Sequence, residues 1–178
     1  MQLAEDVGRV ASLAGYNVVS GGARGVDERA ASGAFAADGT VIAAVADSLL
    51  RNASKKQYRD RLIAGDLVLM TAYSPEAGFS AGNAMDRNRL IYCLADAAVA
   101  VSSANGSGGT FGGAMQNLRA GWVPLWVAQT GDPASGNGAL VGAGAGWLPS
   151  RDDFDIDALF VWPESAGRPD RAIQNALF

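Results

Sequence analysis

Residues 17–46 read NVVSGGARGVDERAASGAFAADGTVIAAVA, and this stretch decides the fold. It begins with a short β-branched strand over 17–20, which two glycines break, and it continues with a helix over 26–37. A second, uniformly apolar strand follows over 40–46. The order of strand, glycine turn, helix and strand predicts the βαβ unit from which parallel sheets are built.

The same alternation continues on both sides of this unit. Helices are predicted over 2–15, 55–65, 83–94 and 111–120, and further strands over 67–72, 97–101 and 123–127. Short, uniformly apolar strands that alternate with helices are typical of a parallel sheet whose two faces are both covered. The sequence therefore predicts an α/β fold, a Rossmann-like doubly wound, mostly parallel sheet with helices on both faces.

The composition is that of a globular protein and excludes several classes of function. The chain has 178 residues, of which 49% are hydrophobic and 18% are charged, enough for one core of ordinary size. Because it has no histidine, histidine-based catalysis and histidine-ligated zinc are excluded, and we predict neither a catalytic residue nor a metal or other cofactor. Cys93 stands among apolar residues and is expected to be a buried thiol in a reducing compartment. Neither a leader sequence nor a long apolar run is apparent, so we expect a cytoplasmic protein without a membrane partner.

Charge is distributed unevenly along the chain. The net charge is −4, yet acidic and basic residues balance up to Gly131, and the tail carries the excess of carboxylates. We therefore expect one Rossmann-like domain over 1–150 and an acidic C-terminal extension over 151–178, packed on the domain or trailing it. Four cations gather within one segment and are named the basic track: Arg51, Lys55, Lys56 and Arg59. The basic track is either a positive face for a polyanion or a solvated helix face.

The turn over 20–27 is the first candidate site for an anion. Ligands of doubly wound sheets bind beyond the carboxyl ends of the strands, and this turn directly follows a strand. Its glycines let the backbone approach a ligand, the helix that follows offers unpaired N–H groups, and Arg24 can bind a phosphate with two parallel hydrogen bonds. Asp27 lies in the first helical turn, where it either complements the helix dipole or contacts the ligand.

Two later segments also carry anion-binding chemistry. Within Asp86–Arg89, Arg87 lies on the apolar face of a predicted helix, so it needs a partner, either a carboxylate such as Asp27 or a bound phosphate. The segment Ser103–Thr110 leads into a helix with two glycines near its start. Each glycine costs about 1 kcal/mol of helix propensity, which favours close packing or a ligand at that position. The hydroxyls of this segment either cap the helix or bind an anion.

Four runs together resemble one known family: VVSGGARGVDERAASGAF, MDRNRLIYCLADAAVAVSS, SGGTFGGAMQNL and WVPLWV. In order and spacing they are similar to the Rossmann-like domain of the DNA-processing family DprA/Smf, which belongs to a superfamily shared with LOG-type nucleotide-binding proteins. The resemblance implies a non-enzymatic, cytoplasmic homodimer that binds single-stranded DNA and passes it to a RecA-type recombinase in natural transformation. The family begins with a strand that ends in a Gly-Ser-Arg turn, whereas this chain begins in the next helix. We expect that the strand is absent from the reading frame or that the sheet is short at one position.

The residue pattern and the resemblance together select one set of candidate contacts to phosphate or nucleic acid. The set is Gly21, Gly22, Arg24, Gly25, Asp27, Arg87, Asn88, Arg89, Ser107, Gly108, Gly109 and Thr110, with the basic track as a second contact.

Two other functions are compatible with the same residues. A lone Rossmann-like domain with a phosphate pocket and no catalytic group is also typical of a sensor for a nucleotide or a nucleotide-derived ligand. Nucleoside-monophosphate phosphoribohydrolases of the superfamily have a Gly-Gly-x-Gly-Thr-x-x-Glu signature that ends in a catalytic glutamate. Here the segment that starts at Gly108 contains Gln116 and no carboxylate. Because glutamine cannot act as a general base, we expect this enzymatic function least.

Overall fold

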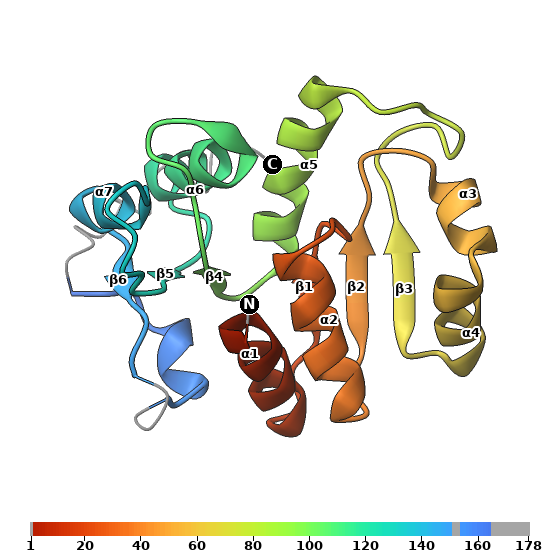
Figure 1. The fold of residues 1–178 in the computed structure, drawn as a ribbon, viewed down its shortest axis with the longest axis horizontal. Helices are drawn as coiled ribbons and strands as arrows, with labels where there is room; N and C mark the ends of the chain where they lie inside the picture. The colour runs from red at the N-terminus through yellow and green to blue at the C-terminus, as the bar shows by residue number, and fades with distance from the viewer. Residues whose placement is uncertain (1, 151–153, 165–178) are drawn as a thin grey trace, which may run out of the picture. The chain divides into compact units, whose positions relative to one another are not determined.

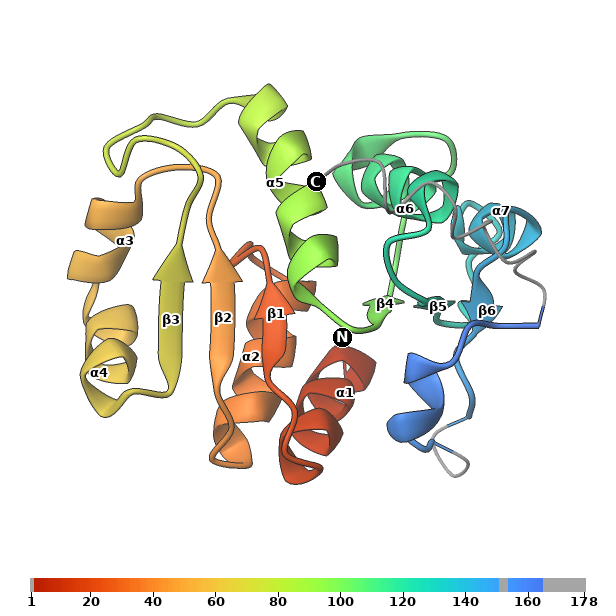
Figure 2. The same cartoon turned by 180° about the vertical axis from the view of Figure 1, so that it is seen from behind.

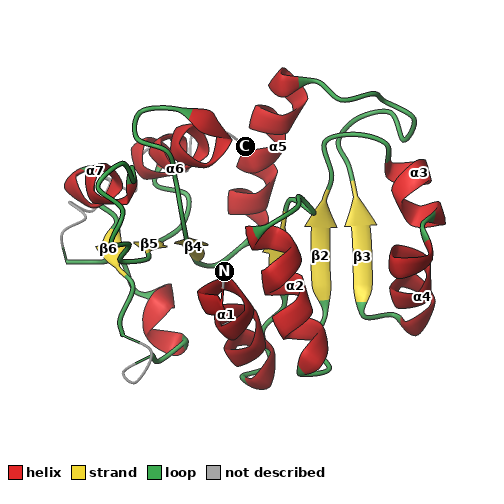
Figure 3. Cartoon of the chain, viewed as in Figure 1, coloured by secondary structure: helices red, strands yellow, loops and turns green. Residues whose placement is uncertain are grey.

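The computed structural model describes residues 2–150 and 154–164, and it confirms the predicted α/β class. Parallel strands alternate with helices along the chain, as Figure 3 shows. The chain divides between Leu94 and Ala95 into two compact units. Each unit contains one three-stranded parallel sheet and is described by itself. The predicted division into 1–150 and 151–178 stays a prediction.

The first unit carries five helices and three strands within its described residues. They are α1 (Gln2–Leu13), β1 (Val18–Ser20), α2 (Val26–Ala36), β2 (Val41–Ala44), α3 (Leu49–Ser54), α4 (Lys56–Ala64), β3 (Leu67–Met70) and α5 (Ala81–Leu94). The sheet has the order β1-β2-β3, with Val18 opposite Val41 and Val41 opposite Leu67 (Figure 1). Because all three strands point the same way, their carboxyl ends lie along one edge of the sheet.

One face of this sheet forms the core of the first unit. Val41, Ala43 and Leu67 are buried there beneath Ala34 of α2, and Leu62 of α4 packs against the same cluster. The opposite face is less covered, since α5 packs mainly on β1 and β2, and Figure 2 shows β2 and β3 from that side with no helix in front. Val68, on the edge strand β3, is 47% exposed. It departs from the prediction that both faces of every strand are buried, because α5 packs mainly on β1 and β2 and leaves this part of β3 exposed.

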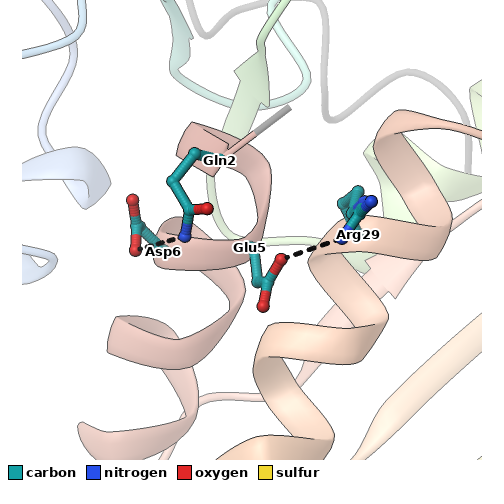
Figure 4. A network of polar contacts seen from close by, with 4 residues as sticks. All are labelled: Gln2, Glu5, Asp6 and Arg29. Atoms are coloured by element: carbon teal, nitrogen blue, oxygen red, sulfur yellow. Dashed lines mark hydrogen bonds and ion pairs between the residues drawn. The ribbon is translucent and has the colours of Figure 1, made fainter.

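Helices α1 and α2 pack closely because glycine faces backbone at two points. A Cβ at Gly8 would overlap the Ala30 carbonyl oxygen, and a Cβ at Gly33 would overlap the Glu5 carbonyl oxygen. Figure 4 shows the ion pair at this interface, with Arg29 Nη1 3.3 Å from Glu5 Oε2. This pair is largely exposed and contributes little, so the close approach of the two backbones defines the contact.

Replacing Gly33 with alanine is expected to lower the free energy of unfolding by about 2 kcal/mol, measured by circular dichroism in a denaturant titration. The added methyl gains about 1 kcal/mol of helix propensity, but it must push α1 away from α2 because the obstacle is backbone. Gly65→Ala is not a suitable control, since that glycine has a positive φ of 83°. Ala36→Ser, at an exposed position of the same helix, is the matched control and leaves stability within about 0.5 kcal/mol. An unchanged midpoint for Gly33→Ala would contradict the packing described.

The second unit repeats the alternation with shorter elements. Within its described residues these are β4 (Ala98–Ala100), α6 (Gly108–Ala120), β5 (Leu125–Val127), α7 (Asn137–Gly142), β6 (Gly146–Trp147) and a 3-10 helix, η2 (Asp157–Phe160). The sheet order is β4-β5-β6, again parallel. Trp126 Nε1 donates to the Leu159 carbonyl at 2.9 Å, so η2, which lies in the predicted acidic extension, packs against β5.

Three sequence predictions need correction. The chain forms α3, a short helix that was not predicted, because Ser48 adopts a left-handed conformation and ends the segment after β2. The helix predicted from residue 111 begins at Gly108, so three residues assigned to a loop form its first turn. Cys93 is exposed and not buried, because it lies on a face of α5 that the described residues leave uncovered.

Two kinds of structural feature do not occur among the described residues. No group of histidine, cysteine, aspartate or glutamate side chains that could hold a metal ion occurs among them. Among these residues there is also no helix with the length and apolar character needed to cross a membrane.

Candidate functional site

The turn after β1 is fixed by one carboxylate. Asp27 Oδ2 accepts hydrogen bonds from the backbone N–H groups of Gly21, at 3.0 Å, and of Ala23, at 3.1 Å. Gly22 and Gly25 have φ values of 65° and 96°, a region that favours glycine, so the sequence of the turn suits its shape. The Asp27 carboxylate therefore organises the turn before α2, whereas among the described residues no side-chain hydrogen bond caps that helix, and a ligand contact of Asp27 stays a prediction.

Arg87 of α5 lies directly against this turn. Its Nη1 donates to the Ala44 carbonyl at 2.9 Å, and a Cβ at Gly21 would overlap the guanidinium. Gly21 is thus required because Arg87 approaches its backbone closely. Burial lowers the pKa of Arg87, and the Asp27 carboxylate, followed by Tyr73 and Asp47, raises it in part. Arg87 therefore joins the carboxyl ends of β1 and β2 as a charged residue whose neighbours are anionic.

The Arg87 guanidinium is only partly engaged by the described residues. Its Nε is buried and has no hydrogen-bond partner in the described structure, while Asp27 and Asp47 supply negative charge nearby. Arg87 donates its hydrogen bond to the Ala44 carbonyl, with Asp27 as an electrostatic neighbour, and a phosphate partner stays a prediction. Asn88 and Arg89 follow on the same helix and project at steps of about 100°, so they do not share the direction of Arg87.

Arg24 differs from Arg87 in its exposure and in its lack of a partner among the described residues. It is exposed, and within the described ranges no hydrogen bond or ion pair engages its side chain. Two N–H groups of the turn are already occupied by Asp27, which leaves the Arg24 guanidinium as the principal donor that the turn offers to a ligand. The structure thus brings Gly21, Asp27 and Arg87 together as a support and presents Arg24 from it.

The basic track lies on α3 and α4, whose segment begins at the carboxyl end of β2. Lys55 Nζ donates to Asn52 Oδ1 at 2.7 Å and Arg59 Nε lies 3.9 Å from Asp60 Oδ1, so both are partly engaged. Arg51 and Lys56 are exposed, and no contact in the described part of the chain neutralises them. The nearby Arg61 is structural, because it stacks on Phe35 and pairs with Asp66 at 2.7 Å.

In the second unit, the residues over 104–110, which lead into α6, are exposed. Ser107 is the N-cap residue of α6, yet its side chain makes no capping hydrogen bond. Gly108 has a φ of 82°, which explains the glycine at this position. Thr110, in the first turn, is exposed as well. The N-terminus of α6 therefore carries an uncapped turn, with Ser107, Gly108, Gly109 and Thr110 placed where a helix dipole attracts an anion.

Asn137 and Asn117, two buried polar residues of the second unit, were missed in the sequence, whereas Ser103 opens a segment that was predicted. Asn137 Nδ2 donates to the carbonyls of Ala128, at 2.9 Å, and Val101, at 3.2 Å, while its Oδ1 accepts from Ser103 Oγ at 2.8 Å. Asn117 similarly bonds both backbone groups of Val123. Ser103 follows β4 and was predicted as part of an exposed anion-binding segment, but its hydroxyl instead lies buried against Asn137, which opens α7.

The fold and this turn define a class of protein. An exposed arginine on a glycine turn at the carboxyl ends of parallel strands is an arrangement in which α/β domains commonly bind anionic ligands. The chain belongs to the family described as DNA recombination-mediator protein A, which matches residues 1–157. No match to a curated protein was found.

Solved structures of similar fold agree with this family. DNA processing protein A (DprA) from Streptococcus pneumoniae has a TM-score of 0.70 and 22% identity, over 87% of this chain and 58% of that one. DNA processing protein A from Helicobacter pylori has a TM-score of 0.69 and 22% identity, over 89% of this chain and 71% of that one. The molybdenum cofactor binding protein from Rippkaea orientalis has a TM-score of 0.59 and 19% identity, over 84% of this chain and 78% of that one. This chain thus spans less than two thirds of the S. pneumoniae chain.

Proposed function

We propose that this chain binds single-stranded DNA through its phosphates, along the edge of the first unit where β1, β2 and β3 end. The observation that carries the proposal is Arg24, an exposed and unpartnered guanidinium on a turn that Asp27 holds in shape. Membership in the DNA recombination-mediator protein A family supports it. The similar H. pylori protein is described as binding single-stranded DNA, which also supports it.

The distribution of free cations extends this contact beyond Arg24. Arg51 and Lys56 are exposed without an ion pair in the described structure, and α3 follows β2 at the same edge of the sheet as the Arg24 turn. A strand of phosphates needs a series of such charges rather than one pocket, and each contact releases counterions. The net charge of −4 does not oppose this, because a local positive face can bind a polyanion on an acidic protein.

The remaining expectations are part of the same proposal. Ser107, Gly108, Gly109 and Thr110, at the start of α6 in the second unit, are proposed as a separate phosphate contact. Asn88 and Arg89, on α5, are secondary members of the set. We also propose three properties that the family resemblance implies: self-association as a homodimer, transfer of the strand to a RecA-type recombinase, and a cytoplasmic location. An assay of DNA binding does not test these three properties.

A small phosphate-bearing ligand is the second candidate. The observation that favours it is that Ser107, the N-cap residue of α6, makes no side-chain capping hydrogen bond at a helix N-terminus, which is a common position for a bound phosphate. The fold similarity to a molybdenum cofactor binding protein is compatible with this candidate. A panel of mononucleotides as competitors separates it from strand binding.

Replacing Arg24 with alanine is expected to weaken binding of a short fluorescent thymidine oligonucleotide by about fivefold or more, measured by anisotropy. The reason is the loss of a charge-assisted hydrogen bond to phosphate, worth about 1.5–3 kcal/mol. Stability should not change, since Arg24 is exposed and makes no contact that the fold needs.

The matched control is Arg9→Ala, which removes the same charge from an exposed position on α1, the helix that leads to the amino end of β1. Its affinity should stay within about twofold of the wild type. Equal losses for both variants would mean a non-specific charge effect and would refute the site. Displacement of the oligonucleotide by one mononucleotide would favour the second candidate.

A further inference from the structure

Two Asn-Gly pairs occur in the second unit, and their surroundings differ. They are Asn105-Gly106 and Asn137-Gly138. Asparagine is a thermolabile residue, since the backbone nitrogen of the next residue can attack the carbonyl carbon of its side chain. Glycine has no side chain to obstruct this attack, and it lets the backbone adopt the conformation that the attack needs. Each pair is therefore a candidate for spontaneous loss of ammonia, if its two reacting groups are free to meet.

At Asn105-Gly106 the reacting groups are free. The two residues form an exposed turn after β4, and Gly106 has a φ of 67°, which glycine accommodates. Among the described residues, no hydrogen bond engages the Asn105 amide or the Gly106 N–H. Apart from its chain neighbours, Gly106 has no heavy atom within 4 Å of the position that a Cβ would take, so a small ring has room to form there.

The residues that flank this turn are held in place. The Gly136 N–H donates to the Ser103 carbonyl at 2.8 Å, and Ala104 pairs with Ser135 in an antiparallel bridge. On the other side, Ser107 is the N-cap residue of α6. The exposure of the turn is thus a property of the folded unit, and reaction at Asn105 needs no unfolding.

At Asn137-Gly138 the same pair is protected. Asn137 is 1% exposed. Its Nδ2 donates to the Val101 and Ala128 carbonyls, and its Oδ1 accepts from Ser103 Oγ. The side chain must leave all three partners before its carbonyl carbon can meet the Gly138 nitrogen, and that requires a local opening of the unit. The chain thus contains an internal comparison for the same chemistry.

We propose that Asn105 is a site of spontaneous deamidation in the folded protein. The Gly106 nitrogen gives up its proton to solvent base and forms a bond to Asn105 Cγ. The bond from Cγ to Nδ2 breaks, and Nδ2 takes up a proton from solvent and leaves as ammonia. Water then opens the resulting cyclic imide at one of its two carbonyls, which yields aspartate or, with the backbone routed through the side chain, isoaspartate. One water is consumed and one ammonia is released, so no oxidant or cofactor takes part.

The product adds one negative charge to the segment that leads into α6. Its consequence for binding rests on the proposed function, in which residues 107–110 are a phosphate contact. A carboxylate two residues before Ser107 interacts favourably with the N-terminus of α6, so it competes with a phosphate there. We expect deamidation to weaken this contact as the protein ages, whereas the Arg24 turn keeps its charge.

The test incubates the folded chain in mildly alkaline buffer, where solvent base is more abundant, and follows both pairs by peptide mass spectrometry. Digestion in mildly acidic buffer stops the reaction before the peptides are measured. We expect the mass change from amide to acid at Asn105 at least about tenfold faster than at Asn137, because the protected residue reacts only through its opened state. In denaturant, where neither residue is protected, the two rates should be similar.

Asn105→Gln is the matched control. It keeps the amide, but the attack has to close a larger and less favourable ring. This variant should fold like the wild type, by circular dichroism, and should form acidic species far more slowly, by isoelectric focusing. A rate at Asn105 no greater than that at Asn137 in the folded chain would overturn the proposal. Equal formation of acidic species by the wild type and Asn105→Gln would overturn it as well.

Asn105→Asp tests the consequence for binding by itself, because it installs the carboxylate directly. We expect it to bind the thymidine oligonucleotide about two- to fivefold more weakly than Asn105→Gln does. Equal affinities would overturn this consequence and leave the deamidation site standing. If the wild type does not bind the oligonucleotide, the proposed function fails, and the mass spectra still decide whether Asn105 deamidates.

Discussion

Replacing Asp27 with alanine should destabilise the first unit and weaken strand binding at the same time. The carboxylate accepts hydrogen bonds from Gly21 and Ala23 and lies beside the partly buried Arg87. Its loss leaves two N–H groups and one cation poorly compensated. Hydrogen bonds to charged groups contribute about 1.5–3 kcal/mol, so we expect the free energy of unfolding to fall by about 2–3 kcal/mol. Denaturant titration followed by circular dichroism measures this.

Whether Asp27→Ala raises or lowers the affinity for DNA distinguishes a structural role of the carboxylate from a purely electrostatic one. Removing a carboxylate near a polyanion site should, by charge alone, raise the affinity for DNA. We expect the opposite, a loss of about tenfold for the thymidine oligonucleotide, because the turn that presents Arg24 is no longer held in one conformation. Anisotropy under conditions where the variant remains folded gives the answer.

Glu28→Ala is the matched control for both measurements. Glu28 is the neighbouring carboxylate in the first turn of α2, so both variants lose the same charge near the same helix N-terminus. Glu28 is exposed, and its replacement should cost less than about 1 kcal/mol and should not weaken binding. If both variants behave alike, Asp27 acts only on the helix dipole, and the support described for Arg24 is incorrect.

Replacing Asn137 with alanine is expected to have the largest effect on the second unit. Asn137 is 1% exposed and joins the segments that follow β4 and β5 to the start of α7. The variant leaves the Val101 and Ala128 carbonyls and the Ser103 hydroxyl without this partner. Each buried group left unsatisfied costs about 1–3 kcal/mol, so we expect a loss of about 3 kcal/mol or more.

Tryptophan fluorescence is the probe for this loss. The four tryptophans of the chain are Trp122, Trp126, Trp147 and Trp162, all of which follow Leu94. Their emission therefore reports unfolding of the second unit. Asn105→Ala, at an exposed position of the segment before α6, is the control and should change stability by less than about 0.5 kcal/mol. A similar midpoint for the two variants would show that the hydrogen bonds of Asn137 do not stabilise the unit.

The alternation of strands and helices could be predicted because each element carries its own signal. Apolar runs such as residues 40–46 differ clearly from their glycine-rich boundaries, and the parallel arrangement follows from the helices between them. Helix α3 could not be predicted in this way. It depends on a left-handed Ser48 and on hydrogen bonds to the connection between β3 and α5, which are contacts distant in sequence.

The candidate site shows the same limit at the level of side chains. The sequence indicated that the turn over 20–27 carries an arginine and an aspartate, but it left two roles open for Asp27 and two partners open for Arg87. The contacts that the structure shows for Asp27 and Arg87 depend on which backbone groups lie nearby. Arg87 reaches Ala44, 43 residues away in the chain, and Asp27 faces the N–H of Gly21 only because glycines allow the turn. Helix and strand propensities and hydrophobic periodicity carry no information about such contacts between residues distant in the chain.

The salt dependence of oligonucleotide affinity tests the central claim most directly, for the wild type and for a variant with Arg24, Arg51 and Lys56 all changed to alanine. If these three cations contact phosphates, the logarithm of the association constant falls with the logarithm of salt concentration, and the slope becomes shallower by about 2 in the variant. We expect this result. An affinity that does not depend on salt, or a slope that the triple change leaves as steep as before, would contradict binding at the edge where β1, β2 and β3 end.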